Sequence, residues 1–245
     1  MIICAAGDWG PDPSPTATTA CAQHPDLMLG LGDYSYESGA DDKAWFLKMD
    51  CLQDKFVGAL GNHDAGDADI YRLLFGHPST SNWNFSLNFQ DVHILAINTE
   101  SADFQFIEND LKVQSKWKIV IFHRPVYTSP GGHAPDEAGI RDKVVPLFDQ
   151  YNVNLVLQGH NHNYQRSYPL NYGSGNDKPK VVASGTTYIV AGTGGESHYD
   201  FSDQAYYIAK QFSDTFGVIC LSVTPNSIVG KFVANDLTLR DNFTI

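Results

Sequence analysis

Five apolar runs in this chain are each followed directly by side chains that can bind a metal ion, and this pattern strongly constrains the fold. The runs end in the sequences GDWG, GDYSY, GNHD, IFHRP and GHNH. The C-terminal ends of parallel strands meet at one edge of a sheet, so side chains far apart in sequence converge there. Glycine beside most of these clusters lets the chain turn sharply around a small centre. We therefore expect the five runs to be strands whose ends share one pocket.

Strand and helix patterns alternate along most of the chain, and strands alone occupy its end. Strand patterns cover residues 2–6, 26–32, 55–61, 83–100 as a pair, 117–123, 153–159 and 186–195. Helical patterns cover residues 40–52, 102–116 and 137–152, the last interrupted by Pro146. Residues 217–244 alternate as in an antiparallel meander. Strands separated by helices and followed by a β-rich tail predict a mixed, layered α/β fold.

Length and charge exclude several classes of protein. At 245 residues and 42% hydrophobic residues, the chain can bury one large core, so we expect a single domain. The net charge of −12 argues against nucleic acid and against an anionic membrane surface as partners. The chain opens with MIICAAG and shows no signal-peptide pattern, which slightly favours an intracellular location. Secretion stays open, because a protein whose leader had been removed would have the same sequence.

The four cysteines are scattered and form no CxxC pair. Cys4 and Cys220 lie in apolar, strand-like runs, where a buried thiol behaves as a small apolar side chain. We therefore expect free thiols rather than disulfide bonds.

The metal-capable residues are too numerous for one tetrahedral zinc ion. Aspartate, asparagine, histidine and tyrosine together suit two metals of intermediate hardness. On an extended segment, His160 and His162 face the same side, about 6–7 Å apart at their base. Such a pair can serve two neighbouring ions or bind a single one, so the spacing leaves both arrangements open.

The ordered set GDxG, GDxxY, GNH(D/E), xxxH and GHxH resembles the calcineurin-like metallophosphoesterase superfamily. The tyrosine three residues after the second aspartate, together with YIVAGTGG and GHNHNYQR, resembles the purple acid phosphatase branch. The motifs span residues 7 to 162. The resemblance implies a central β-sandwich of two mixed sheets flanked by helices.

The resemblance also implies a binuclear centre in which Asp33 bridges the two metals. Metal 1 would be Fe³⁺, held by Asp8, Asp33, Tyr36 and His162. Metal 2 would be Fe²⁺, Zn²⁺ or Mn²⁺, held by Asp33, Asn62, His123 and His160. The histidines of GHNH would then complete the shells of different metals.

Such a centre would hydrolyse phosphomonoesters, with a small-molecule phosphate ester as substrate. Water bound by two metals loses its proton readily and supplies the attacking hydroxide. The ions bring about +5 and three ionised ligands about −3, so a dianionic phosphate is attracted. His63 and His133 resemble the substrate-facing histidines of the family, as general acids or phosphate contacts, and Asp64 would orient His63.

Two other functions stay open. A phosphodiesterase, acting on cyclic nucleotides or phospholipid headgroups, would use the same metals, and loops 65–82, 126–137 and 193–207 would decide between the two substrates. A scaffold with a structural metal site would be expected to lack a ligand or a substrate-facing histidine, and this chain lacks neither. Arg124 and Arg166 are candidates for phosphate binding or for structural ion pairs.

Plant-type purple acid phosphatases carry an additional N-terminal β-domain, and from its length we expect this chain to lack one. By this resemblance, residues 1–245 would be one minimal catalytic domain, like the short mammalian and microbial forms.

Overall fold

Two large β-sheets pack face to face in the computed structural model, which describes residues 1–36, 42–75, 82–173 and 178–245. In spatial order, the six-stranded sheet holds β15 (Leu239–Thr244), β14 (Ile228–Ala234), β13 (Gly217–Val223), β1 (Ile2–Ala6), β2 (Leu27–Gly30) and β3 (Phe56–Gly58). The seven-stranded sheet holds β12 (Ile208–Phe212), β8 (Tyr164–Ser167), β11 (Thr187–Ala191), β7 (Leu155–Gln158), β6 (Trp117–Ile121), β5 (Val92–Ala96) and β4 (Phe85–Phe89). A small hairpin pairs β9 (Leu170–Asn171) with β10 (Lys180–Val181).

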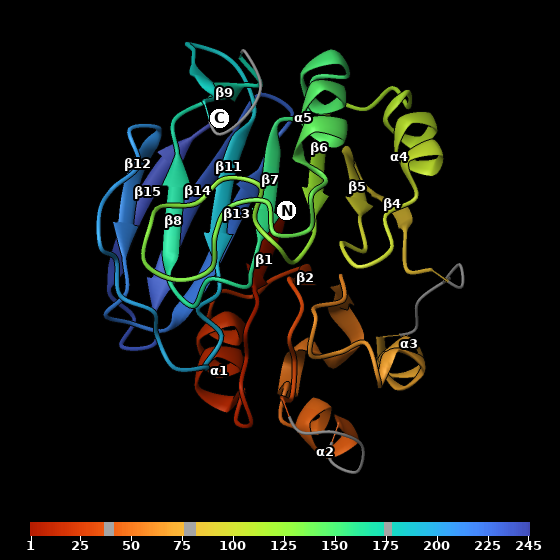
Figure 1. Ribbon diagram of the computed structural model, residues 1–245. Helices are drawn as coiled ribbons and strands as arrows, with labels where there is room; N and C mark the ends of the chain where they lie inside the picture. The colour runs from red at the N-terminus through yellow and green to blue at the C-terminus, as the bar shows by residue number, and fades with distance from the viewer. Residues whose placement is uncertain (37–41, 76–81, 174–177) are drawn as a thin grey trace.

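Helices cover the outer faces of both sheets, which gives the layered α/β sandwich predicted above. Figure 1 shows α1, α2 and α3 beside the six-stranded sheet, and α4 and α5 on the other side of the molecule. Their bounds are α1 (Ser14–Ala22), α2 (Asp42–Leu47), α3 (Ala68–Phe75), α4 (Phe104–Leu111) and α5 (Arg141–Gln150), with a 3-10 helix at Asp50–Lys55.

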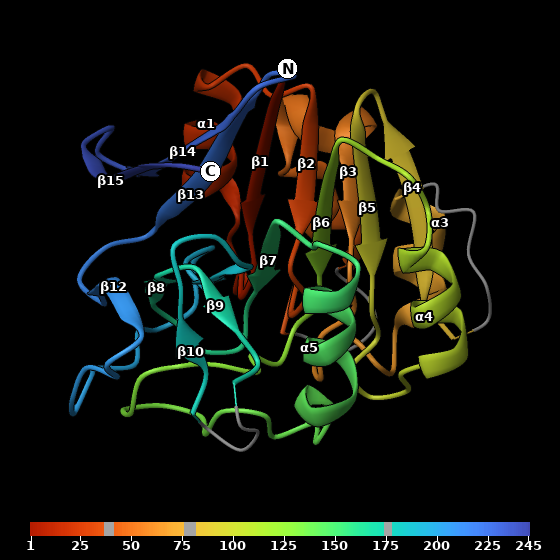
Figure 2. The same ribbon diagram turned by 90° about the horizontal axis from the view of Figure 1, so that it is seen from above.

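The strands that precede the metal-capable residues run parallel within each sheet. β1, β2 and β3 are parallel neighbours in one sheet, and β5, β6, β7 and β11 in the other. In Figure 2 the arrows of β1, β2, β5 and β6 point toward the same edge of the sandwich. The loops that leave this edge therefore come from both sheets.

The main core lies between the sheets. Along β6 and β7, Ile119 and Leu157 face the six-stranded sheet, whereas Val120 and Val156 pack under α4 and α5. This alternation leaves both faces of the seven-stranded sheet buried, which is why its central strands read as continuous apolar runs.

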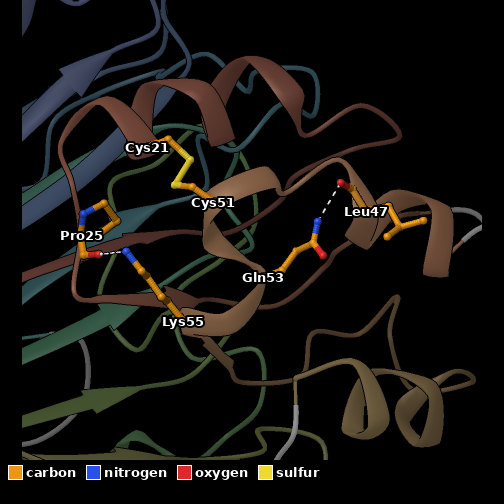
Figure 3. The surroundings of a disulfide bond; sticks show 6 residues. All are labelled: Cys21, Pro25, Leu47, Cys51, Gln53 and Lys55. Carbon is orange, nitrogen blue, oxygen red and sulfur yellow. Dashed lines mark hydrogen bonds between the residues drawn. A yellow bond between two sulfur atoms is a disulfide. The ribbon is translucent and has the colours of Figure 1, made fainter.

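The cysteines form two disulfide bonds, so the expectation of free thiols was wrong. Cys4 and Cys220 lie opposite each other in the antiparallel pair β1–β13. Cys21, at the end of α1, is bonded to Cys51 in the 3-10 helix (Figure 3). The same figure shows Nζ of Lys55 donating to the carbonyl oxygen of Pro25 at 2.9 Å, so two bonds tie these segments together.

Helix α5 begins at Arg141 rather than at Glu137. Gly139 adopts a φ of +64°, which ends the preceding turn, and the Asp136 carboxylate accepts hydrogen bonds from the backbone N–H groups of Ile140 and Arg141, both at 2.9 Å. The residues before the helix therefore stay in a loop, where Glu137 is free to serve the site described below.

Several elements escaped the sequence patterns. Helix α1 lacks an apolar stripe, but its Ala17 and Ala20 are buried, and its threonines bond Asn235 in the turn after β14. Helix α3 and strands β8, β9, β10 and β12 were also not predicted. In the part of the chain that the structure describes, no helix is both long and apolar enough to span a bilayer.

Candidate metal centre

The loops that follow β1, β2, β3, β6 and β7 bring all seven predicted ligands to the shared edge of the sandwich. Asp8, Asp33, His123, His160 and His162 are buried. The backbone N–H of His160 donates to Oδ2 of Asp8 at 2.8 Å, which joins the loop after β7 to the loop after β1. Residues 152 positions apart in sequence are thus in direct contact.

One group of ligands gathers around His123. Its Nε2 atom lies 3.1 Å from Oδ2 of Asp33, 3.2 Å from Oδ1 of Asn62 and 3.2 Å from Nδ1 of His160. Its Nδ1 atom lies 2.8 Å from the carbonyl oxygen of Leu31. When Nδ1 donates to that carbonyl, the lone pair of neutral His123 lies on Nε2, which is the arrangement of a metal ligand.

A second group gathers around His162. Its Nε2 atom lies 3.0 Å from the Tyr36 hydroxyl and 3.4 Å from Oδ1 of Asp8, and the Tyr36 hydroxyl donates to the same oxygen at 3.2 Å. Nδ1 of His162 lies 2.8 Å from the carbonyl oxygen of Ser197. His162 is therefore oriented by a backbone carbonyl in the same way as His123.

The backbone around these ligands is conformationally unusual. Asp8, Asp33, Tyr36 and His160 have φ angles of 58°, 53°, 59° and 68°, in the left-handed region that non-glycine residues seldom occupy. Each costs of order 1–3 kcal/mol and persists only where the surroundings impose it. Residues with such strained backbones concentrate at functional sites, and all four of these residues are predicted metal ligands.

Close approach requires glycine at this edge. A side chain at Gly61 would collide with the carboxylate and backbone of Asp33, and one at Gly159 would lie 2.6 Å from Oδ2 of Asp8. These glycines let the loops after β3 and β7 pack directly against ligands from other strands.

The electrostatics of the His123 group favour a bound cation. Burial acts to lower the pKa of His123, but the charge and hydrogen bond of Asp33 outweigh it and raise the pKa to about 9. His160 shows the opposite effect, because burial and the charge of His123 lower its pKa to about 4. Burial opposes the ionised form of Asp33, yet His123 holds the pKa of Asp33 well below its usual range. The group thus stabilises one positive charge among its members.

The electrostatics of Tyr36 set a condition on its role as a ligand. Burial, followed by the charges of Asp8 and Asp33, raises the pKa of the Tyr36 hydroxyl. The phenolate form would therefore need a strongly charged cation beside it. The donor chemistry fits two ions. The His123 group offers carboxylate, amide oxygen and imidazole, and the His162 group offers carboxylate, phenol and imidazole.

Glu137 is a site residue that the sequence analysis missed. Its Oε2 atom lies 2.9 Å from Nε2 of His160 and accepts from Nη1 of Arg124 at 3.0 Å, while Oε1 lies 3.3 Å from Nδ1 of His133. Burial would raise the pKa of Glu137, but its bond to His160 and the other contacts lower it to about 2. Asp33, His123 and His160, and separately His133, Glu137 and His160, have ligand atoms close enough to share an ion. Because Glu137 was expected to be the first residue of a helix over 137–152, its sequence context did not indicate a place beside His160.

The two predicted substrate-facing histidines contact different ligands. The exposed ring of His63 lies 4.6 Å from that of Tyr36, and its backbone N–H donates to Oδ1 of Asp33 at 2.8 Å. The ring of His133 stacks on His160 with centroids 3.8 Å apart. Tyr199, another residue that the sequence analysis did not single out, stacks on His162 at 4.2 Å.

Asp64 braces the ligand loops. It is buried and accepts from the backbone N–H groups of Asp33, Tyr34 and Gly61 at 2.8, 2.9 and 2.7 Å. Burial and the charge of Asp33 raise its pKa to about 7. Its hydrogen bonds thus fix the backbone beside Asp33, whereas the expectation was that it orients His63.

The two candidate arginines, Arg124 and Arg166, lie in different surroundings. Arg124 lies at the site, where it pairs with Glu100 at 2.6 Å as well as with Glu137. Arg166 forms a structural ion pair with Asp241, at 2.7 and 3.0 Å.

Comparison with known proteins agrees with this geometry. Residues 3–164, about two thirds of the chain, match the family described as calcineurin-like phosphoesterase. A purple acid phosphatase of Glycine max is 30% identical over 205 residues, which cover 69% of this chain and 44% of the relative. A phosphoenolpyruvate phosphatase of Allium cepa is 26% identical over 205 residues, covering 69% and 43%. The chain thus matches less than half the length of these relatives.

Solved structures share the fold. The purple acid phosphatase PPD1 from yellow lupin seeds superposes with a TM-score of 0.82 at 18% identity, covering 100% of this chain and 53% of that one. GAP50, the anchor in the inner membrane complex of Plasmodium, superposes with a TM-score of 0.77 at 17% identity, covering 100% and 88%. Matches at these identities establish the fold alone. With the family match and the two ligand groups, they lead to one conclusion: the chain belongs to the calcineurin-like phosphoesterase family, in which it resembles the purple acid phosphatase branch.

Proposed function

We propose that this chain is a metal-dependent phosphatase that hydrolyses phosphomonoesters at a binuclear centre. The observation that carries the proposal is the pairing of two carbonyl-oriented histidines with two different carboxylates. Nε2 of His123 meets Asp33, and Nε2 of His162 meets Asp8. A single ion would leave one of these two groups without a cation.

The residues divide between the two ions as the resemblance implies. Asp8, Tyr36 and His162 would hold a ferric ion, and Asn62, His123 and His160 would hold Fe²⁺, Zn²⁺ or Mn²⁺, with Asp33 shared. When bound, such a pair supplies an activated water for attack on phosphorus and neutralises the charge of the phosphate.

The protein's own side chains would then bind the phosphate and handle the proton of the leaving group. His63 and His133 flank the ligands and carry ring nitrogens, so either can donate a proton to the departing oxygen. Glu137 holds Nδ1 of His133 at 3.3 Å, which leaves Nε2 of that ring to face a substrate. Loss of a general acid costs about 10²–10⁴-fold in rate.

We also infer that residues 1–245 act as one catalytic domain, because ligands from both sheets share one site and the sheets share one core. The physiological substrate in this proposal is a small phosphate ester.

The test is hydrolysis of phenyl phosphate by the purified protein across pH 4–8, with its metal content measured before and after treatment with a chelator. We expect turnover that the chelator abolishes and that added metal restores. Asn62→Ala should lose both turnover and metal, whereas Asn226→Ala, an exposed asparagine in the turn between β13 and β14, should lose neither. Faster hydrolysis of bis(phenyl) phosphate than of phenyl phosphate would favour the diesterase, and absence of metal-dependent turnover on both would contradict the proposal.

A further inference from the structure

A pocket of about 510 Å³ lies beside the candidate metal centre. Two loops form its walls, one at residues 128–135 and the other at 203–207. Both belong to the loops expected to decide substrate choice. The lining residues that matter for its chemistry are Pro130, His133, Pro135, Asp203, Tyr206 and Tyr207.

His133 connects this pocket to the ligands. This residue lines the pocket, and its ring stacks on that of His160 with centroids 3.8 Å apart. A phosphate held at His160 would therefore direct the rest of its molecule past His133. Continuity with the site makes the leaving group of the substrate the occupant that fits the pocket.

The pocket presents apolar surface because its polar groups are engaged elsewhere. The Tyr207 hydroxyl donates to the carbonyl oxygen of Thr128 at 2.9 Å. The side-chain amide of Gln204 donates to the carbonyl oxygen of Ile208, also at 2.9 Å. The hydroxyl of Tyr206 donates to the carbonyl oxygen of Pro179 at 2.6 Å, which holds its ring in place although the residue is 62% exposed. A fixed, exposed tyrosine ring in a pocket that Pro130 and Pro135 also line suits an aromatic ligand.

The charges around the pocket disfavour an anionic leaving group. Asp203 is its charged wall, and no lysine or arginine lines it among the residues that the structure describes. Arg124, the arginine beside His160, already pairs with Glu100 and Glu137. A carboxylate or second phosphate on the leaving group would therefore meet a negative side chain that no lysine or arginine of the described lining offsets.

We propose that this pocket receives an uncharged aromatic leaving group, so that the protein prefers aryl phosphates to esters whose leaving group carries a second negative charge. The preference in turnover rests on the proposed phosphatase function. The binding preference can be measured without turnover, which keeps the two ideas separable.

The test uses phosphonates, which bind like phosphate esters but are not hydrolysed. Titration calorimetry on the metal-containing protein would compare methylphosphonate, phenylphosphonate and 4-carboxyphenylphosphonate. The last two differ only by a carboxylate that is too distant to bind the same metal pair. We expect phenylphosphonate to bind about ten-fold more tightly than either of the others.

Two variants, each with a matched control, localise the effect to the pocket. Asp203→Lys should bring the affinity for 4-carboxyphenylphosphonate up to that for phenylphosphonate, whereas the matched control Asp236→Lys, on the distant β14–β15 turn, should leave the ranking unchanged. Tyr206→Ala should weaken phenylphosphonate by about five-fold and spare methylphosphonate, whereas Tyr206→Phe should retain affinity because it keeps the ring.

Equal affinities for the three phosphonates, or a ranking that Asp203→Lys and Asp236→Lys change alike, would overturn the pocket assignment. The expected ranking without hydrolysis of phenyl phosphate would support the pocket and overturn the phosphatase function. Hydrolysis of phenyl phosphate without the expected ranking of phosphonate affinities would support the phosphatase function and overturn the pocket assignment.

Discussion

Oε2 of Glu137 lies 2.9 Å from Nε2 of His160, the ring atom that points away from Asp33 and His123. The partner of the outer ring nitrogen fixes the orientation and basicity of a metal-binding histidine, and its loss costs about 10–100-fold in metal affinity. We expect Glu137→Gln to weaken metal retention by this amount, as measured by elemental analysis after dialysis against graded chelator concentrations.

The matched control is Glu100→Gln. Glu100 also pairs with Arg124, but among the residues that the structure describes it bonds neither His133 nor His160. Equal metal loss in the two variants would show that Glu137 acts through Arg124 and not through His160.

Tyr36 is predicted to give the protein a colour. A phenolate bound to Fe³⁺ absorbs visible light, so the iron-loaded protein should be pink to violet, and Tyr36→Phe should bleach it. Tyr199→Phe is the control, because Tyr199 stacks on His162 without bonding the Asp8 carboxylate. A visible band that survives in Tyr36→Phe would remove Tyr36 from the ligand set, and a colourless, active, fully loaded protein would indicate zinc or manganese at both positions.

The Arg166–Asp241 pair is predicted to stabilise the fold. Both side chains are largely buried, and Asp241 also accepts from the hydroxyl of Tyr164 at 2.9 Å. Asp241→Asn leaves the guanidinium of Arg166 without its charge partner and should lower the free energy of unfolding by about 2 kcal/mol, measured by urea denaturation. Asp214→Asn removes the exposed partner of Arg240 and should cost less than about 1 kcal/mol.

This pair also predicts a pH dependence. Burial opposes ionisation of Asp241, but the hydrogen bonds and charge of Arg166 outweigh it, so the pKa of Asp241 is lowered in the folded protein. Its contribution to stability is therefore complete above the pKa of an unfolded aspartate and is lost as the pH falls toward the lower folded value. The difference in unfolding free energy between wild type and Asp241→Asn should shrink on acidification, and a constant difference would contradict this origin.

The two disulfides are predicted to differ in accessibility. Cys51 is exposed, whereas Cys4 and Cys220 are buried. Mild reductant should therefore release two thiols from the native protein, those of Cys21 and Cys51, and mass spectrometry after alkylation would identify them. Release of Cys4 and Cys220 first would contradict the burial argument.

Loss of the Cys21–Cys51 bond should also destabilise the protein. The bond closes a loop with a sequence separation of 30, for which the chain-entropy estimate is about 3–4 kcal/mol. The Cys21→Ser, Cys51→Ser double variant should show this loss in urea denaturation while keeping the metals. Such bonds persist in oxidising compartments.

The convergence of the proposed ligands was predictable because each of them follows a strand, and parallel strands place their ends together. Local pattern was sufficient for Asp8, Asn62 and His123, whose strands read as apolar runs stopped by a polar cluster. The partners that orient these ligands were not predictable, since Glu137 reaches His160 only through a loop held open by Gly139 and Asp136.

The disulfides and helix α1 escaped for related physical reasons. Cys4 meets Cys220 through the register of β1 against β13, across a sequence separation of 216, and no local pattern encodes such a register. Helix α1 is built from alanine and threonine, so it has no apolar stripe to detect, and tertiary packing determines its conformation.

The strand that carries Asp8 has its antiparallel neighbour near the other end of the chain. β1 lies between β2 and β13, and β7, which carries the GHNH loop, lies between β6 and β11. A fragment cut after residue 164 would keep every motif yet expose an unpaired edge in each sheet. The segment that bears the chemistry is therefore not an autonomous folding unit, and the last third of the polypeptide is required to hold its first and fifth motifs face to face.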